Sequence, residues 1–186
     1  MSKVSIKGAD TGTGVFTIES PATNTDRTLT LPDEAGEIVT SAKYEQGGAF
    51  FVRKTSNQGI SGSTYTKVGF ETVIFDALGE FDLSTDRFTP TVAGYYQLNT
   101  SVIIDAVADN TFVRVSIYKN GSLFATVGRD YGVSSTSDVC ASGSCTVEAN
   151  GTTDYFEVFV QTSDSASTVI GGNNTTIFSG HLVRKA

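Results

Sequence analysis

The residues of this sequence that could do acid, base or nucleophilic chemistry are few and scattered. His181 is the only histidine, and it lies in an alternating apolar segment with no serine in a nucleophile-elbow context before it. We therefore expect it to pack in a strand or lie on an edge strand rather than act as a base. The acidic pairs Glu80 with Asp82 and Asp154 with Asp164 lie in turn-like segments, where carboxylates commonly accept hydrogen bonds from backbone N–H groups. The sequence predicts no enzyme, and a polysaccharide-cleaving carboxylate pair is kept as a minor alternative.

Metal, disulfide and phosphate chemistry is also weakly indicated. Cys140 and Cys145 enclose Ala-Ser-Gly-Ser, which predicts a loop that a disulfide could close if the two Cα atoms lie within about 7 Å. A reducing cytosol favours two free thiols instead, and both states stay open. One histidine and two cysteines make a zinc site improbable, while calcium bound among loop carboxylates is left open. Gly12-Thr13-Gly14 and Gly171-Gly172 precede no predicted helix, so they are interpreted as turns rather than phosphate cradles.

Charge and composition restrict the classes of partner. The 186 residues carry a formal net charge of -7, and the 13 lysines and arginines are scattered along the chain, which argues against nucleic-acid binding. A trimer would carry three times this charge and repel its own copies in solution. No stretch approaches the roughly 20 apolar residues of a membrane span, and the first residues lack a signal peptide's apolar run. We expect synthesis in a cytoplasm and no membrane insertion.

Most of the chain is predicted to form strands, with no convincing helix. The segment 94–105 places Tyr96, Leu98, Thr100, Val102 and Ile104 on one face, and the segment 111–119 places Val113, Val115 and Ile117 on one face. Asn120-Gly121 and Asn150-Gly151 each predict a tight hairpin between flanking strands. About ten short strands with turns between them indicate an all-β sandwich or jelly roll.

The first 46 residues are predicted to be a separate β-rich arm, and residues 47–186 a head. In the arm, Thr28 to Leu31 and Glu37 to Thr40 look like two short strands around a Pro and Gly turn, too small a unit to be stable alone. Gly14-Val15-Phe16-Thr17-Ile18, Arg27 to Pro32 and Gly36 to Thr40 resemble a segment that recurs in phage tail fibres and other phage structural proteins. The resemblance implies a virion-attachment or trimerising segment; an ordinary hairpin on a globular domain is the alternative.

Aromatic and turn residues in the head recur at a spacing that resembles the globular head of the C1q-like family, which is related to the tumour necrosis factor fold. The positions that carry it are Phe70, Asp76, Phe81, Phe88, Gly94 and Tyr96. Two places depart, since the family has aromatics where this chain has Leu98 and Thr100. The end of the chain, Phe178 to Val183, resembles the family's closing strand with His181 in place of an aromatic. The resemblance covers about residues 50–185 and implies a jelly roll, a compact homotrimer and binding loops without a catalytic centre.

The segment from Tyr155 to Gln161 is apolar on both sides, which indicates a strand covered by a second layer. We expect Phe156, Val158 and Val160 to enter the sandwich core. Tyr155 and Phe159, on the other side, are the predicted trimer contact. The alternative is that loops of the same chain cover both rings.

The sequence thus predicts a phage virion protein: a short trimeric tail fibre or fibre tip that attaches to the host cell surface. The alternative is a head fibre or capsid decoration protein with the same trimeric head. Residues 1–45 would bind other virion proteins, and the receptor would be a glycan or an envelope protein. The connections 106–110, 130–144 and 162–174 are predicted to be exposed loops. Their predicted receptor-facing residues are Asp109, Asn110, Asp130, Tyr131, Ser137, Asp138, Asp164, Asn173 and Asn174.

Overall fold

The structure is a computed structural model of the chain. It describes residues 47–134, 137–164, 166–172 and 175–186, together with residues 11, 13–15, 17, 19, 22–26 and 28 of the N-terminal segment. The chain divides into two compact units, Met1–Ile38 and Val39–Ala186. Apart from Thr28, the arm strands predicted at 28–31 and 37–40 lie outside the described residues. The predicted boundary between residues 46 and 47 stays a prediction.

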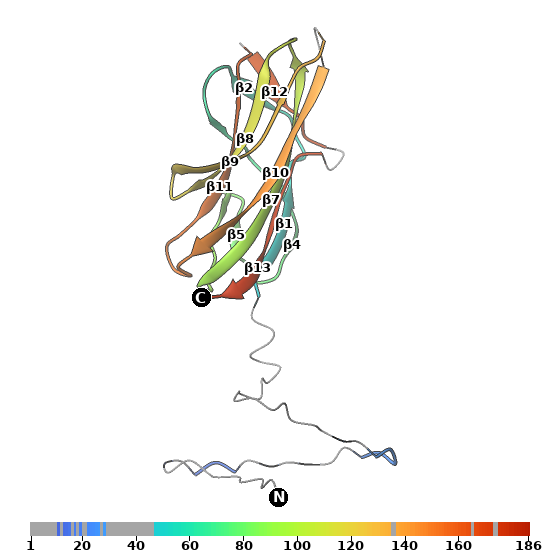
Figure 1. Cartoon of the computed structure of the whole chain (residues 1–186), viewed down its shortest axis with the longest axis vertical. Coiled ribbons are helices and arrows are strands. Elements are labelled where there is room, and N and C mark those ends of the chain that lie inside the picture. The colour runs from blue at the N-terminus through green and yellow to red at the C-terminus, as the bar shows by residue number, and fades with distance from the viewer. Residues whose placement is uncertain are drawn as a thin grey trace, which may run out of the picture. The chain divides into compact units, whose positions relative to one another are not determined.

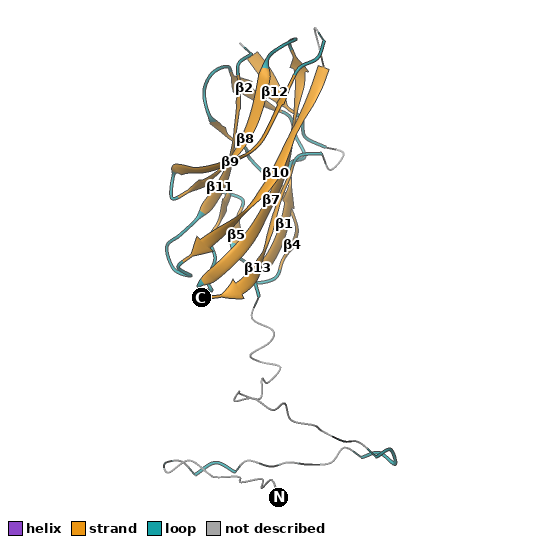
Figure 2. Cartoon of the chain, in the orientation of Figure 1, coloured by secondary structure: helices purple, strands orange, loops and turns teal. Residues whose placement is uncertain are grey.

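The described part of the head contains 13 strands and no helix, in two antiparallel sheets (Figure 2). Sheet A has the order β2-β12-β7-β13-β1-β4, with β10 also paired to β7. Its strands are β1 (Ala49–Arg53), β2 (Gln58–Ser61), β4 (Thr72–Asp76), β7 (Gly94–Val107), β10 (Ser137–Ala149), β12 (Ala166–Val169) and β13 (Ile177–Lys185). This all-β architecture was predicted, and the two sheets pack face to face along the long axis of the head (Figure 1).

Sheet B has the order β5-β6-β11-β8-β9, with β3 paired to β11. Its strands are β3 (Thr66–Lys67), β5 (Phe81–Asp82), β6 (Arg87–Phe88), β8 (Phe112–Lys119), β9 (Ser122–Tyr131) and β11 (Phe156–Thr162). Three of these, β3, β5 and β6, have only two residues each. Such short strands have too few residues to show a period of two, so the predicted count of about ten was too low.

The alternation predicted for the long strands is confirmed. On β7, the residues Tyr96, Leu98, Val102 and Ile104 have no exposed surface, and Thr100 is also buried. On β8 and β11, the inward residues Val113, Val115, Ile117, Phe156, Val158 and Val160 are fully buried, as predicted. Successive side chains of a strand point to opposite faces, so each strand sends one row into the core and one row outward.

A cluster of aromatic rings joins the two sheets at one end of the core. Phe50 of β1 stacks on Phe88 of β6 with ring centres 4.2 Å apart and meets Phe178 of β13 edge to face at 5.0 Å. Phe81 of β5 lies 5.5 Å from Phe50, and Tyr96 of β7 lies 5.5 Å from Phe88. Rings from both sheets therefore share one set of contacts, which adds favourable ring geometry to the burial of a large apolar area.

The positions that carry the C1q-like spacing have physical roles in this part of the fold. Phe70, Phe81, Phe88 and Tyr96 are members of the aromatic cluster. Asp76 accepts a hydrogen bond from the Phe81 N–H at 2.7 Å, which fixes the turn between β4 and β5. A side chain at Gly94 would overlap the carbonyl oxygen of Arg184, so β7 and β13 need a glycine there to approach.

Of the two predicted hairpins, one is confirmed and the other is wrong. Asn120 and Gly121 both have positive φ, at 53° and 75°, and connect β8 to β9 as a type I′ turn would. Asn150-Gly151 instead connects β10 in sheet A to β11 in sheet B. The Asn150 Oδ1 atom accepts hydrogen bonds from the N–H groups of Thr152, Thr153 and Asp154. The side chain thus caps a wider turn between the sheets.

The loop predicted over residues 130–144 is also wrong, because most of it is strand. Asp130 and Tyr131 end β9, and β10 begins at Ser137 and pairs with β7 from Ser137 to Ala149. Val139, Ala141 and Val147 point inward and are buried, while Cys140, Ser142, Ser144 and Thr146 are exposed on the outward side. A sheet face that need not fill a core tolerates small polar residues, which made the strand look like a loop. Likewise, Ala106 lies in β7, and β12 interrupts the segment 162–174.

The strand also separates the two cysteines. Cys140 is exposed and faces outward, whereas Cys145 is half-buried and packs against the core. Five residues of extended chain span about 17 Å, well beyond disulfide geometry. Both cysteines are free, which corrects the expectation of a loop around them.

Close contact between the backbones of β9 and β10 closes one edge of the sandwich. A side chain at Gly128 would meet the backbone of Ser142, and one at Gly143 would overlap the carbonyl oxygen of Val127. Only glycine leaves room for two backbones at this distance. The two sheets therefore meet where β9 ends sheet B and β10 lies along β7.

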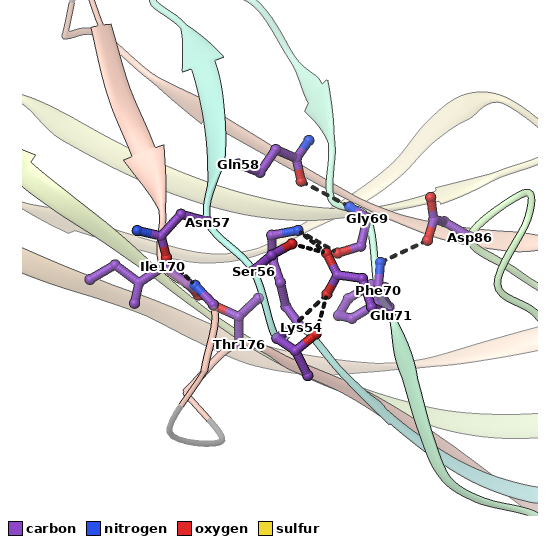
Figure 3. Close-up of polar contacts among 12 residues, drawn as sticks. Lys54, Ser56, Asn57, Gln58, Gly69, Phe70, Glu71, Asp86, Ile170 and Thr176 are labelled. Atoms are coloured by element: carbon purple, nitrogen blue, oxygen red, sulfur yellow. Dashed lines mark hydrogen bonds and ion pairs between the residues drawn. The ribbon is translucent and has the colours of Figure 1, made fainter.

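A polar cluster around the buried Lys54 joins the segments after β1 and before β4 (Figure 3). Lys54, 3% exposed, donates hydrogen bonds from its ammonium group to the Gly69 carbonyl at 3.0 Å and to Glu71 Oε1 at 2.9 Å. Glu71 also accepts from the Thr55 N–H and from the Ser56 hydroxyl. Burial alone would raise the pKa of Glu71, but these hydrogen bonds and the Lys54 charge outweigh it and lower the pKa to about 2.

The same cluster anchors the connection between β12 and β13. The Lys54 carbonyl accepts from the Gly172 N–H at 3.1 Å, and the Lys54 N–H donates to the Thr176 carbonyl at 2.9 Å. Asn57 accepts from the Gly171 N–H through its side chain at 2.9 Å. The described part of this connection is therefore held to the body of the head by backbone hydrogen bonds.

Truncating the centre of the aromatic cluster is predicted to destabilise the head strongly. Phe88→Ala removes a ring that is 1% exposed and should lower the free energy of unfolding by about 3–5 kcal/mol. The matched control is Phe124→Ala, because Phe124 is 48% exposed on β9 and should change stability little. Equilibrium unfolding in urea measures both, and equal losses would contradict the assigned role of the cluster.

Removing the Glu71 charge is predicted to change the response to acid. Since its pKa is lower in the folded state than its usual 4.5, the unfolded chain binds the proton more tightly. Glu71 therefore stabilises the fold above about pH 4.5, and this contribution is lost as the pH falls towards 2. Glu71→Gln should cost about 1–3 kcal/mol at pH 7, because it leaves the buried Lys54 without its charged partner, and should flatten the loss of stability in acid.

The matched control is Glu148→Gln on β10, whose side chain is exposed. Urea unfolding midpoints measured across the acid range compare the two variants with the parent chain. The role assigned to Glu71 would be contradicted by identical pH profiles of the two variants.

Candidate assembly and binding surfaces

The outward side of β10, β7 and β13 forms a surface without charged side chains at its centre, called here the uncharged face. In register, Ser142, Ser101 and Ile177 form one row across the three strands. The next rows are Ser144, Asn99 and Ser179, and then Thr146, Gln97 and His181. Small polar residues cost less to bury than charged ones when they hydrogen-bond across two such surfaces, and depletion of charge is typical of the centre of protein interfaces.

Apolar side chains border the uncharged face on the side of β1 and β4. Phe51 of β1 and Phe75 of β4 have ring centres 6.1 Å apart, and Phe75 is 51% exposed. The edge strand β4 also exposes Val73 and Ile74, at 37% and 49%. An edge strand with a run of exposed apolar residues is a surface for pairing with another chain.

The outward side of sheet B has a different character and is called here the arginine-aromatic face. Tyr118 of β8 stacks on Phe159 of β11 with ring centres 3.9 Å apart, and Tyr65 meets Tyr118 edge to face. Arginines lie over rings of this face. The pairs are Arg87 on Tyr155, Arg114 on Phe112 and Tyr65, and Arg129 on Phe112 and Tyr131, with distances of 4.0–5.9 Å.

Glu157 is the acidic residue that β11 places on this face, and it is already paired. It is 3% exposed and accepts from Lys67 Nζ at 3.3 Å and from Arg87 Nε at 3.0 Å. The hydrogen bond that Arg87 donates to Glu157 is the main reason that the pKa of Arg87 is raised. A buried carboxylate between two cations is satisfied electrostatically, which leaves little negative charge for other ligands.

The structure places the two predicted trimer-contact residues on the arginine-aromatic face. Tyr155 lies under the Arg87 guanidinium, and Phe159 stacks on Tyr118, so each ring is half-buried by its own chain. This is close to the alternative left open by the sequence, with side chains rather than loops as the cover. The contact through Tyr155 and Phe159 stays a prediction.

The three predicted receptor-facing segments meet at one end of the head. The Ala108 N–H donates to Asp164 Oδ2 at 3.0 Å, and the Asn110 N–H donates to the Gly132 carbonyl at 3.0 Å. This end follows Val107, the last residue of β7. The first residue of β7, Gly94, pairs with Lys185 at the opposite end of the strand. The turn residues Asp109 and Asn110 are exposed there.

The other predicted receptor-facing residues of β9 and β10 lie close to the same end, since Tyr131 precedes Gly132 and Ser137 pairs with Val107. Asp130 and Tyr131 end β9 and are exposed, while Ser137 and Asp138 begin β10. Asn173 and Asn174 lie outside the described residues. The structure therefore brings the segments around residues 109, 132 and 164 together, with the end of β9 and the start of β10 beside them.

The residues considered for catalysis lie in strands or accept hydrogen bonds that hold turns. His181 is exposed on β13 between β1 and β7, so it lies outward on an interior strand. Asp82 accepts from Ser84 and Thr85, and Asp154 accepts from Asn120 and Asn150, the turn-capping roles that were predicted. Within the described residues, no three His, Cys, Asp or Glu side chains form a group that could hold a metal ion. Nor does that part of the chain contain a helix suited to crossing a membrane.

The sequence analysis predicted binding loops and did not predict the uncharged face or the arginine-aromatic face. The signal for the arginine-aromatic face is an alternation on β8, in which Phe112, Arg114, Ser116 and Tyr118 alternate with the inward-facing Val113, Val115 and Ile117. The uncharged face could have been found from the serines and asparagine of 97–101 and 142–146, once both segments are taken as strands. Exposed positions were passed over because only inward rows were used to assign strands.

Comparison with solved structures identifies the same fold in proteins of distant sequence. The globular domain of zebrafish complement 1qA protein has a TM-score of 0.53 at 16% identity, over 76% of this chain and 100% of that one. Murine APRIL at pH 5.0 has a TM-score of 0.56 at 12% identity, over 74% of this chain and 100% of that one. Eiger TNF from S. frugiperda has a TM-score of 0.53 at 8% identity, over 75% and 93%. At these identities the likeness concerns the fold.

Sequence comparison agrees with this architecture. No curated protein sequence matches the chain. The C1q domain model matches residues 49–183, from the start of β1 to the last strand, and so spans most of the chain. The predicted resemblance to C1q-like and tumour necrosis factor-like jelly rolls is thereby confirmed, and the chain belongs to the C1q domain family.

Proposed function

We propose that the head is a homotrimeric, non-enzymatic binding module that attaches a phage virion to the host cell surface. Domains of the C1q family are typically binding or structural modules, which supports the absence of a catalytic role. The proposal for the virion rests on the N-terminal segment, whose sequence resembles attachment segments of phage fibres. Residues 1–45 would bind other virion proteins, and the head would be displayed on the tail or capsid surface.

The observation that carries the proposal of a trimer is the uncharged face. With a net charge of -7, two copies repel each other, and the repulsion is smallest where neither surface carries charge. Rows such as Ser144, Asn99 and Ser179 offer hydrogen-bonding groups without a desolvated charge. The exposed apolar residues of β4 adjoin this face through β1, and burying them in a neighbouring copy would remove an exposed edge.

Assembly through this face leaves the meeting point of the three segments near Asn110, Gly132 and Asp164 free to contact a receptor. Three copies would present three such ends in parallel. Weak contacts that act together can raise the overall strength of binding by about 10² to 10⁴ over a single site. A trimer of weakly binding heads can therefore bind a cell surface with repeated receptors tightly.

A charge at the centre of the uncharged face is predicted to abolish assembly. Asn99→Glu would bury a carboxylate without a partner in each interface, so the chain should sediment as a monomer of 19.6 kDa instead of a trimer. Gln161→Glu on the outward side of sheet B is the control for the same change and should leave the trimer intact. Sedimentation equilibrium measures both.

The competing contact at Tyr155 and Phe159 is tested in the same measurement. Monomers from Tyr155→Lys with Phe159→Lys, together with trimers from Asn99→Glu, would move the interface to sheet B. For the attachment function, purified parent protein should block adsorption of virions that carry it, and the Asn99→Glu monomer should block far less. Labelled protein spread over the capsid, with adsorption unaffected, would favour the decoration role instead.

A further inference from the structure

Two arginines on the arginine-aromatic face are held together without an acidic partner. Arg114 of β8 and Arg129 of β9 are direct partners in the register of the two strands. Both guanidinium groups lie over the same ring, with Cζ atoms 4.4 Å and 4.7 Å from the centre of Phe112, and Arg129 also lies 5.0 Å from the centre of Tyr131. Like charges directly opposite in a sheet destabilise it.

No carboxylate of the described chain offsets this repulsion. Neither arginine takes part in an ion pair within the described residues, and the Arg114 Nε atom is buried without a hydrogen-bond partner there. Arg114 makes one long hydrogen bond, 3.4 Å, to the Tyr65 hydroxyl. Its neighbour in register on β11 is the neutral Gln161.

The nearest acidic residues in these strands are turned away or engaged. Asp130 is paired in register with the inward-facing Val113, so it leaves β9 on the other side from Arg129, and it accepts a hydrogen bond from the Tyr131 N–H. Glu157 is buried between Lys67 and Arg87. Two positive groups are therefore fixed at one place on an otherwise acidic chain.

The geometry suits an anion that also has an apolar face. A guanidinium presents N–H donors in a fork that matches the two oxygens of a carboxylate, and stacking on Phe112 holds each fork before a ligand arrives. Tyr131, 47% exposed, adds an open ring beside them. An acidic sugar residue has a carboxylate that the guanidinium groups can bind. Its ring is about as large as one aromatic ring and carries C–H groups that can pack against Tyr131.

We propose that Arg114, Arg129, Phe112 and Tyr131 form a binding site for a carboxylate-bearing sugar residue of a surface polysaccharide. The inference rests on the proposed binding function and deepens it in two ways. It places a site on the side of each head, beside the end where the receptor-facing segments meet. It also names the chemical class of the ligand, an acidic glycan bound through its carboxylate.

The acidity of the whole chain does not prevent such binding. At physiological salt, charges more than about 8 Å apart are largely screened, so a ligand at this site meets mainly the two guanidinium groups. Because part of the attraction is between charges, binding should weaken as salt is raised. The contact with the two rings should keep part of it.

The experiment uses the full chain and a defined probe, the trimer of galacturonic acid, titrated by calorimetry. Arg114→Gln with Arg129→Gln should weaken binding at least about tenfold, because charge-assisted hydrogen bonds are lost. Arg129→Gln alone, at an exposed position, guards against misfolding of the double variant. Arg129→Lys keeps the positive charge but not the forked N–H donors. Its affinity for the sugar should fall between that of the parent chain and that of Arg129→Gln. Arg184→Gln, an exposed arginine of β13, is the control and should bind like the parent.

Several results would overturn the assignment. One is that the fully methyl-esterified sugar binds as tightly as the free acid. The others are an unchanged affinity of the double variant and the absence of any heat of binding at millimolar sugar. Competition by inorganic sulfate as strong as that by the sugar would show a simple anion site instead. The solution mass of the protein in the same samples separates the two proposals. If the protein is trimeric but does not bind the sugar, only the proposed glycan site is contradicted. If the protein is monomeric, the proposed assembly is contradicted.

Discussion

The contact between aromatic rings of the two sheets is the interaction on which the rest of this head depends. Phe50 and Phe178 come from sheet A, and Phe81 and Phe88 come from sheet B. These rings come from strands far apart in sequence, so the cluster holds β1 and β13 of sheet A against β5 and β6 of sheet B. Burying several large rings in one place also supplies much of the apolar area that a domain of this size needs.

Once the inner faces are joined, the outer faces are free to differ. Sheet A turns small uncharged residues outward, and sheet B turns arginines and aromatic rings outward. The close contact of β9 with β10 at Gly128 and Gly143 joins the two sheets at one edge. One face can therefore serve assembly while the other binds a ligand, and neither role interferes with the core.

The sequence predicted the inward rows well and the surfaces poorly. Burial imposes a strict period of two on Tyr96 to Ile104 and on Val113 to Ile117, so their faces were assigned correctly. The same period is hidden in β10, where Gly143 and Cys145 alternate with serines, and the strand was taken for a loop. The Asn150-Gly151 turn was misplaced because turn residues do not show which sheet the next strand joins. Nor does any local pattern show that Arg114 and Arg129 face each other, since that depends on the register of two strands.

Cys140 offers the most direct test of the central claim, that the uncharged face is where copies of the chain meet. It is exposed on β10 beside Ser101, within this face, and Cys145→Ala leaves it as the single thiol. The rate of reaction with a maleimide should fall as protein concentration rises and trimers form. In a matched chain with Cys140→Ala, Cys145→Ala and Ser122→Cys, the single thiol at the start of β9 should react at a constant rate. If Cys140 reacts equally fast in the trimer and in the monomer, the copies meet through another surface.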